Sequence, residues 1–282
     1  MTEIKHQHIV PACYLANWGI NGNQGRKSEV YFFDVNNHQA RVSSVNKLPT
    51  ENYFYDTPEL GEKKQLLENF FGVIEGEYAA LLQKLLKRIE DRQNINSNKE
   101  PLLSTEDKNE LTSQFAMQIV RTQAFRSGYE HVWTTLKESF PWANIPDFTK
   151  GDIQAMHTDE IGSFRMARFY ANLLNDRNLV FLINHSTSPL LTSDNPGIFI
   201  NHSANLSEPM SPVSKDVTFY MPLSPKVAVE FYHKSILRFP EICIPLDFSR
   251  IVHGYNRRLR GECVRFMFSN KNDFSYLIGS EK

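Results

Sequence analysis

The residues best suited to chemistry lie in a short polar stretch between two apolar segments. Residues 191–196 read Leu-Thr-Ser-Asp-Asn-Pro and lie between the apolar runs 178–184 and 198–200. Asp, Asn and Pro end strands, because their side chains bond to nearby backbone or because a donor is missing. Such a turn could present the carboxylate of Asp194 and the amide of Asn195 to a ligand. The alternative is an Asx-type turn that satisfies only its own backbone.

His8 could form an acid–base or metal-binding pair with Asp194. An imidazole titrates near neutral pH, and a neighbouring carboxylate fixes its tautomer. A divalent metal could bind at this pair with His185 as a further ligand, although His185 is not part of a His-x-His or His-x3-His spacing. His8 could equally fill a corner of the fold before Pro11. The sequence therefore does not identify a cofactor.

Arginines offer anion-binding groups in two places. Arg121 follows Gln118 on a predicted helix, and a buried guanidinium there would need a carboxylate or an anionic ligand. Near the end of the chain, Arg257 and Arg260 share a predicted helical face with Asn256 and could contact phosphate. A solvated basic face is the alternative. We take Gln118, Asn256, Arg257 and Arg260 as the predicted substrate-binding residues.

A second arginine and a histidine have a spacing seen in one class of ribonuclease. Arg126 and His131 match the Arg-x4-His signature, and the segment resembles the catalytic helix end of HEPN-type ribonucleases. That resemblance implies RNA cleavage without a metal. The chain contains nine histidines, so an Arg-x4-His spacing arises easily by chance. Gly128, which lies between the two residues, further weakens the match. A metal-independent HEPN-like ribonuclease is kept as an alternative.

The elements that must position these residues follow from the hydrophobic period. A 3.6-residue period predicts a long helix over 62–94, a second from Thr105 into 129–138, and a third over 151–176. Charged residues of the first helix, Glu68 among them, are expected away from its apolar stripe. The second half alternates with a period of two. It predicts strands over 178–184, 190–193, 197–201, 218–222, 226–232 and 264–269, with a helix over 249–260; an earlier strand is predicted over 29–35.

The order of elements predicts an α+β fold. A helical layer from the central segment is expected to pack on a mostly antiparallel sheet from the C-terminal half. At 282 residues the chain could form one large domain or two small ones. We expect a single domain over 1–282, with an N-terminal strand region, a helical region over 62–176 and a sheet-rich region over 178–280.

Composition limits the partners and the cell compartment. The net charge is -1, so no overall attraction to nucleic acid or anionic membrane is expected. No apolar run is long enough to cross a bilayer, and the first residues lack the apolar core of a signal peptide. The three cysteines are far apart, which fits reduced thiols and no cysteine zinc site. We expect a cytoplasmic protein with no membrane partner.

Several motifs occur together in a recognisable order. They are His8-Ile9-Val10-Pro11 with Tyr14-Leu15, Gln118 to Arg121-Thr122, Thr192-Ser193-Asp194-Asn195-Pro196, and Pro222-Leu223-Ser224-Pro225, followed by Asn256. With them the chain resembles the bacterial and phage-associated domain-of-unknown-function family numbered 4238, over nearly its whole length. The resemblance implies a fold unit and marks His8, Arg121, Asp194, Asn195 and Asn256. It implies no reaction.

Two functions of different class follow. In the first, the protein is an enzyme acting on a phosphate-bearing substrate, nucleic acid or nucleotide, such as a nuclease-type toxin or phage-defence effector. Arg121 would hold the anion, His8 and Asp194 would act as acid–base groups or metal ligands, and Asn195 and Asn256 would orient the substrate. In the second, the same Arg, Asp and Asn side chains form a structural network in a non-catalytic module that binds a ligand or a partner not identifiable from sequence.

Overall fold

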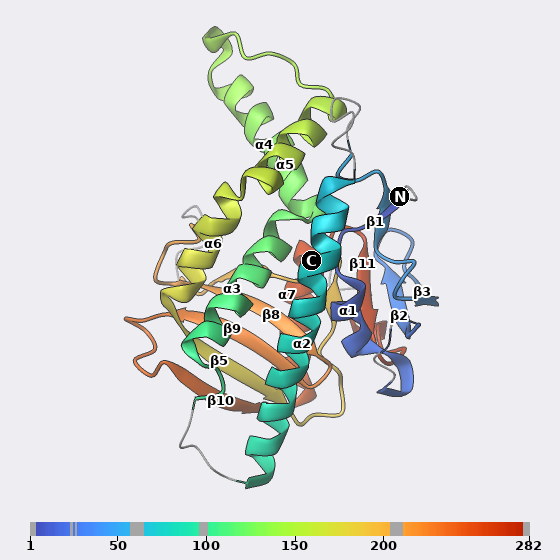
Figure 1. The fold of residues 1–282 in the computed structure, drawn as a ribbon, viewed down its shortest axis with the longest axis vertical. Helices are drawn as coiled ribbons and strands as arrows, with labels where there is room; N and C mark the ends of the chain where they lie inside the picture. Colours follow the sequence, from blue (N-terminus) through green and yellow to red (C-terminus); the bar gives the residue numbers. More distant parts are fainter. Residues whose placement is uncertain are drawn as a thin grey trace.

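A five-stranded sheet from the C-terminal half lies at the centre of the fold (Figure 1). The computed structural model describes residues 4–22, 25, 27–56, 65–95, 101–203 and 211–278. Neighbouring strands are antiparallel except for the edge pair β10–β5, which is parallel. In spatial order the strands are β10 (Glu241–Leu246), β5 (Arg177–Asn184), β9 (Val227–His233), β8 (Val217–Ser224) and β7 (Ile198–Asn201). The expected mostly antiparallel sheet is confirmed.

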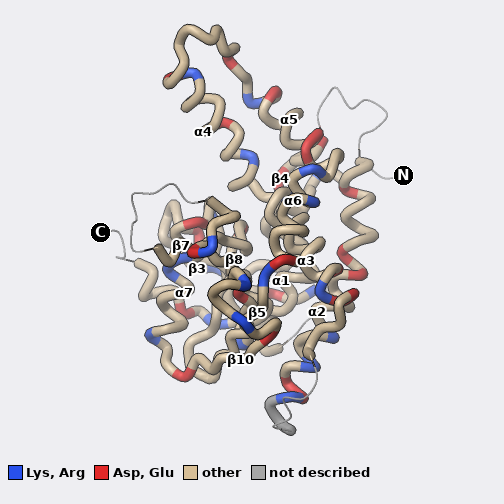
Figure 2. The backbone as a smooth tube through the Cα atoms, turned by 90° about the vertical axis from the view of Figure 1, so that its left-hand side faces the viewer, with Lys and Arg blue, Asp and Glu red and all other residues tan. Residues whose placement is uncertain are grey.

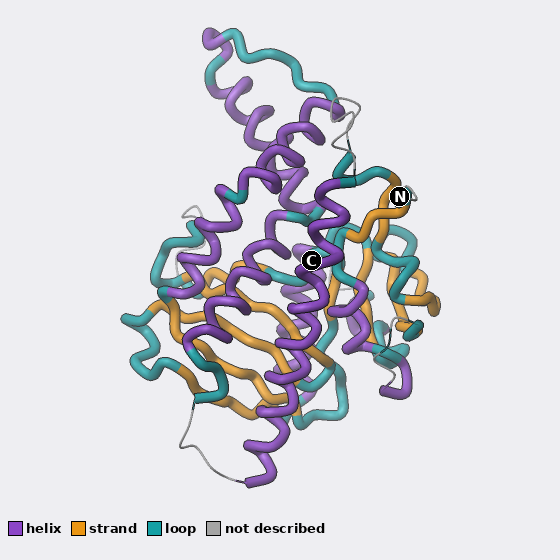
Figure 3. Tube along the Cα trace, in the orientation of Figure 1, coloured by secondary structure: helices purple, strands orange, loops and turns teal. Residues whose placement is uncertain are grey.

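Helices cover both faces of this sheet. Leu179, Phe181 and Ile183 of β5 belong to the core shared with α2 (Leu66–Ile95), α3 (Thr105–Val120) and α6 (Arg165–Asn175). The alternate residues Val180 and Leu182 belong to the core shared with α7 (Ser249–Glu262). Side chains alternate along a strand, so a strand covered on both sides is apolar throughout. Figure 3 shows the helical layer in front of the strands and supports the expected α+β class.

A smaller sheet joins the two ends of the chain. Its strands, in spatial order, are β3 (Gln39–Ser44), β2 (Glu29–Asp34), β11 (Phe266–Ser269) and β6 (Thr192–Ser193). A separate pair joins β1 (His6–His8) to β4 (Thr50–Asn52). The short helix α1 (Ala12–Leu15) and the 3-10 turns η1 (Ala16–Trp18) and η2 (Ile20–Gly22) connect β1 to β2. Residues 192–193 therefore lie beside the last strand.

Two of the predicted long helices are each broken in two. The helix expected from Thr105 to 129–138 divides into α3 and α4 (Gln123–Ser139), because the Thr122 hydroxyl accepts from the backbone N–H of Phe125 at 3.2 Å and starts a new helix. The helix expected over 151–176 divides into α5 (Lys150–Ser163) and α6, because Phe164 adopts a left-handed φ of 57°. Helices α4 and α5 form a hairpin that projects from the rest of the molecule (Figure 1).

The structure also contains strands that the alternation did not predict. β10 carries Pro245, whose missing N–H is tolerated at the edge of a sheet. β3 is mostly exposed, so it lacks an apolar alternation. The remaining short elements are the 3-10 turns η4 (Pro141–Ala143) and η5 (Ser275–Leu277).

Charge is spread rather than concentrated. Figure 2 shows Lys and Arg interspersed with Asp and Glu along the chain, in keeping with the net charge of -1. Within the described residues, no helix combines the length and apolar character needed to cross a membrane.

Candidate functional site

The predicted site residues fall into two separate groups. Gln118 Nε2 donates to the carbonyl of Ile9 at 3.3 Å, and Arg121 Nη2 donates to the carbonyl of His8 at 2.7 Å. His8, Gln118 and Arg121 therefore meet where the end of α3 contacts the segment after β1. Asp194 and Asn256 bond to other parts of the chain, described below. The pairing of His8 with Asp194 that the sequence suggested is not formed.

Arg121 is the centre of the first group and is fully engaged by the protein itself. Its side chain is 2% exposed. Nε donates to the Tyr55 hydroxyl at 3.1 Å, and Nη1 forms an ion pair with Glu75 at 2.9 Å. The guanidinium carbon lies 4.0 Å from the centre of the Phe71 ring. Burial acts to lower the pKa of Arg121, but Tyr55 and Glu75 outweigh it, so the pKa is raised and the charge is permanent.

Helix α2 supplies the opposite wall of this group. Glu68, Phe71, Glu75 and Tyr78 follow one another at spacings of three and four residues, which places them on one face of a helix. Tyr78 and Phe71 are buried, and Glu68 and Glu75 are half-buried. Glu68 lies off the apolar stripe as expected, but it is half-buried near Arg121 rather than on a solvated face. We call His8, Tyr55, Glu68, Glu75 and Arg121 the α2 polar cluster.

Glu68 is the first of two acid–base groups in the α2 polar cluster. Burial, with the charges of Glu75 and Asp56, raises its pKa to about 7, and Arg121 opposes that rise. Its buried Oε2 meets no hydrogen-bond partner among the described residues. A buried polar atom without a partner is uncommon and calls for an explanation. A carboxyl that titrates near pH 7 is suited to donating or accepting a proton under physiological conditions.

His8 is the second acid–base group. Burial lowers its pKa, while Glu75 acts in the opposite direction, so the ring is neutral at pH 7. Its buried Nε2 has no hydrogen-bond partner among the described residues. The backbone at Val45 and Asn46 also opposes the fall in the pKa. When the hydrogen of the neutral ring is on Nδ1, Nε2 carries a free lone pair.

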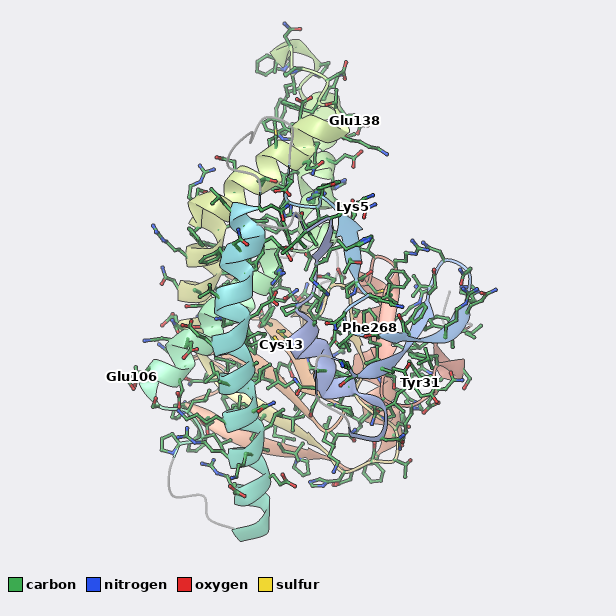
Figure 4. All side chains as sticks on the ribbon, turned by 45° about the vertical axis from the view of Figure 1, so that its right-hand side comes forward. Lys5, Cys13, Tyr31, Glu106, Glu138 and Phe268 are labelled. Carbon is green, nitrogen blue, oxygen red and sulfur yellow. The ribbon has the colours of Figure 1, made fainter. Side chains whose placement is uncertain are left out.

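Cys13 lies beside the α2 polar cluster but is not a nucleophile. Its Sγ donates to the carbonyl of Glu75 at 3.4 Å, and Figure 4 shows Cys13 next to α2. Burial and the charge of Glu75 raise the pKa of its thiol to about 12. Because the thiolate is the reactive form, this cysteine is inert at neutral pH.

Asp194 belongs to a saturated structural network. Its carboxylate accepts from the backbone N–H groups of Val264, Arg265 and Phe266 at 2.9, 2.7 and 2.9 Å. Its own N–H donates to the carbonyl of Phe266 at 2.9 Å. Burial raises the pKa of Asp194, and the three backbone bonds oppose that rise. Asp194 therefore fixes the start of β11, and neither an open carboxylate nor a purely local Asx turn describes it.

Asn256 and Asn195 extend this network to α7. Asn256 accepts from the N–H of Leu191 at 2.9 Å and donates to the carbonyl of Pro189 at 2.9 Å and to the Tyr276 hydroxyl at 2.6 Å. Asn195 Nδ2 donates to the carbonyl of Glu262 at 3.0 Å. Both amides tie the loops around β6 to α7. We call Asp194, Asn195 and Asn256 with these partners the Asp194 network.

The predicted arginines of α7 differ from one another in exposure. Asn256 faces the core, Arg260 is half-buried one turn later, and Arg257 is exposed. The predicted common face of Asn256, Arg257 and Arg260 is therefore not a single binding wall.

The Arg-x4-His pair does not face a common site. Arg126 is buried, where it donates to Nδ1 of His157 at 3.1 Å and to the carbonyl of Phe54, and its guanidinium carbon lies 3.5 Å from the centre of the Phe54 ring. His131 is exposed on the projecting helix α4. Burial, followed by the charge of Arg126, lowers the pKa of His157 to about 3, so the partner of Arg126 is a neutral imidazole in the core.

An open pocket lies elsewhere on the helical layer. It has a volume of about 310 Å³ between α2, α3 and α6, and its lining is mostly apolar. None of the predicted site residues lines it. In the part of the chain that the structure describes, no group of three or more His, Cys, Asp or Glu side chains is arranged to hold a metal ion.

Comparison with known proteins assigns a family but no activity. The family described as "Protein of unknown function (DUF4238)" matches residues 6–273 of the chain. No curated protein and no solved structure matches the chain.

Proposed function

The chain belongs to the DUF4238 family, and from its own residues we propose that it is an enzyme in which Glu68 and His8 transfer protons. The observation that carries this proposal is the presence of two buried atoms without a partner among the described residues, Glu68 Oε2 and His8 Nε2, at the same ion pair. A purely structural network would be expected to satisfy both atoms. A substrate that supplies the missing partners accounts for them.

The two groups have complementary protonation states near pH 7. Protonated Glu68 can donate to a leaving oxygen, and the lone pair of His8 Nε2 can accept a proton from water as its oxygen attacks. In such a hydrolysis one proton moves to His8 and one leaves Glu68, and exchange with solvent restores both. The protonation states thus favour a hydrolase.

Arg121 has a different role from the one the sequence suggested. Each of its three nitrogens already donates to Tyr55, Glu75 or the carbonyl of His8, so we propose it as a positioning residue that aligns β1 with α2. Because Glu75 already balances the charge of Arg121, an anionic substrate is tolerated here only while Glu68 is neutral. A phosphate-bearing substrate, nucleic acid or nucleotide, is the class proposed for testing, in a role such as that of a toxin or phage-defence effector.

The test is a cleavage assay with matched variants. Wild type, Glu68→Gln, His8→Gln and the control Glu77→Gln, which changes an exposed glutamate of the same helix, are incubated with labelled RNA, DNA and a nucleotide panel, with and without divalent metal. We expect cleavage by wild type and the control, and a loss of about 100-fold or more in either cluster variant. Full activity in folded Glu68→Gln would refute the proposal.

A second candidate is favoured by the Asp194 network. The carboxylate of Asp194 and the amide of Asn256 are fully used within the protein, as expected for a non-catalytic module with a structural Arg, Asp and Asn network. In that case no substrate in the panel is cleaved by wild type, and a ligand or partner that raises its melting temperature is the result to expect.

A further inference from the structure

A serine and a histidine meet where the loop after β5 packs on α7. Ser188 lies in the loop 185–191 that connects β5 to β6, and His253 lies in the second turn of α7. The distance from Ser188 Oγ to His253 Nε2 is 2.9 Å. The two residues are 65 positions apart in the chain, so tertiary packing and not a local turn brings them together. A hydroxyl in contact with an imidazole is the arrangement that activates a serine as a nucleophile.

Two buried asparagines hold the backbone of the loop at Ser188 and just after it. Asn184 Nδ2 donates to the carbonyl of Ser188 at 2.8 Å. Asn256 of α7 donates to the carbonyl of Pro189 and accepts from the N–H of Leu191, both at 2.9 Å. The position of Ser188 relative to α7 is therefore fixed, which a nucleophile requires because small displacements cost much of its reactivity.

A tyrosine fixes the ring of His253. The rings of His253 and Tyr276 are stacked, with centroids 3.8 Å apart and planes inclined by 13°. Asn256 Nδ2 donates to the Tyr276 hydroxyl at 2.6 Å, and the same nitrogen bonds to the serine loop. One amide of α7 thus orders both the loop that carries the serine and the ring that orients the histidine. A general base held in place by a neighbouring group is the second requirement for activating a serine.

The protonation state of His253 suits a base. Burial lowers its pKa, Asp273 opposes this fall and Arg257 adds to it, so the ring is neutral at pH 7. When the hydrogen of the neutral ring is on Nδ1, Nε2 accepts the hydrogen of Ser188 Oγ. Among the described residues, Oγ has no hydrogen-bond partner other than His253. Ser188 is 8% exposed and His253 is half-buried, which shelters the pair from bulk water.

The structure contains a second serine–histidine contact of a different kind. Ser235 Oγ lies 2.8 Å from His233 Nδ1, but the backbone N–H of Ser235 also donates to that nitrogen at 3.2 Å. The two residues are two positions apart, and their hydrogen bond is exposed to solvent. A backbone donor already uses the lone pair of His233 Nδ1, so Ser235 is not activated. It therefore serves as the matched control for Ser188.

We propose that Ser188 and His253 form a nucleophile–base pair that cleaves a carboxylic ester, at a site separate from the α2 polar cluster. Ser188 Oγ attacks the ester carbonyl carbon, and its proton moves to His253 Nε2. The bond from that carbon to the alcohol oxygen breaks, and the alcohol takes the proton from Nε2. A water then gives a proton to Nε2 and attacks the acyl carbon. The bond to Oγ breaks, Oγ regains the proton, and the carboxylic acid leaves.

The test measures covalent labelling by a fluorophosphonate, in which phosphorus takes the place of the ester carbonyl carbon. Attack by Ser188 forms an Oγ–P bond and releases fluoride, and mass spectrometry of the digested protein locates the label. We expect wild type to be labelled at Ser188, and Ser188→Ala to lose this label. His253→Gln should be labelled at least about 100-fold more slowly, because the hydroxyl has lost its base. Ser235→Ala should be labelled like wild type.

Hydrolysis of p-nitrophenyl acetate by the same proteins tests the ester as the substrate class. Ser188→Ala and His253→Gln should each lose about 100-fold or more of the wild-type rate, and Ser235→Ala should keep it.

The proposal is overturned if wild type is not labelled at Ser188 or does not hydrolyse the ester. It is also overturned if His253→Gln is labelled as fast as wild type. The label is located in wild type itself, so this result does not depend on how well a variant folds. Glu68 and His8 take no part in this reaction, so this proposal and that of proton transfer in the α2 polar cluster fail separately.

Discussion

The Asp194 network and the α2 polar cluster are both buried and polar, yet they differ in how completely their groups are satisfied. In the first, the carboxylate of Asp194 takes three backbone donors and Asn256 uses both ends of its amide. In the second, Arg121 is equally well paired, but Glu68 Oε2 and His8 Nε2 have no partner among the described residues. On our proposal, this difference distinguishes residues that stabilise the fold from residues that take part in proton transfer.

The largest expected effect on stability is in the Asp194 network, where the polar groups are fully hydrogen-bonded. Asp194→Ala leaves three buried N–H groups without an acceptor, and we expect the free energy of unfolding to fall by about 3–5 kcal/mol. Urea denaturation measures it. Asp194→Asn, which keeps one carbonyl acceptor, should lose less. A loss below about 1 kcal/mol in Asp194→Ala would show that the network does not hold β11.

Arg121→Met should have the next largest effect. It leaves Glu75 half-buried without its ion-pair partner, so we expect a loss of about 2–4 kcal/mol in unfolding free energy. The double variant Arg121→Met with Glu75→Met removes both charges and should recover part of that loss. If the double variant is as unstable as the sum of the two single variants, the ion pair is not what holds α2 against the end of α3.

Asn195→Ala should have the smallest effect on stability among these variants. Its bond to the carbonyl of Glu262 is exposed to solvent, so we expect a loss of about 0.5–1 kcal/mol in the same denaturation measurement. A loss comparable to that of Asp194→Ala would mean that the turn after β6, rather than the carboxylate of Asp194, stabilises this region.

The sequence predicted the class of the fold, and its site residues stay a prediction. The strand over 178–184 is a nearly continuous apolar run and the helix over 249–260 has a helical period, and burial sets both patterns. The breaks at Thr122 and Phe164 depend on one residue each, and a continuous apolar period passes over them. His8, Gln118 and Arg121 meet as residues of one site should. Their separation from Asp194 depends on how β11 pairs with β6, which is long-range and leaves no local signal.

Glu68 was missed for a different reason. A glutamate on a helix is usually solvated, but Glu68 is half-buried near Arg121, which lies 53 positions later in the chain. The spacing of Glu68, Phe71, Glu75 and Tyr78 was a usable signal. It indicates that two acids share a face with aromatic residues, which requires a cation opposite them.

The most direct test of the distinction between the two regions is the titration of Glu68, followed as the difference in unfolding free energy between Glu68→Gln and wild type from pH 4 to 8. Burial raises the folded pKa from 4.5 to about 7. The folded state therefore binds more protons than the unfolded state in this window, and wild type loses stability as pH rises through it. Glu68→Gln lacks this loss. The unfolding free energy of the variant minus that of wild type should therefore increase by about 1 kcal/mol, a value reduced for the partial solvent exposure of Glu68. The difference should level off above pH 7. A difference that is constant above pH 5 would show an ordinary carboxylate and contradict the assignment of Glu68 as an acid–base group.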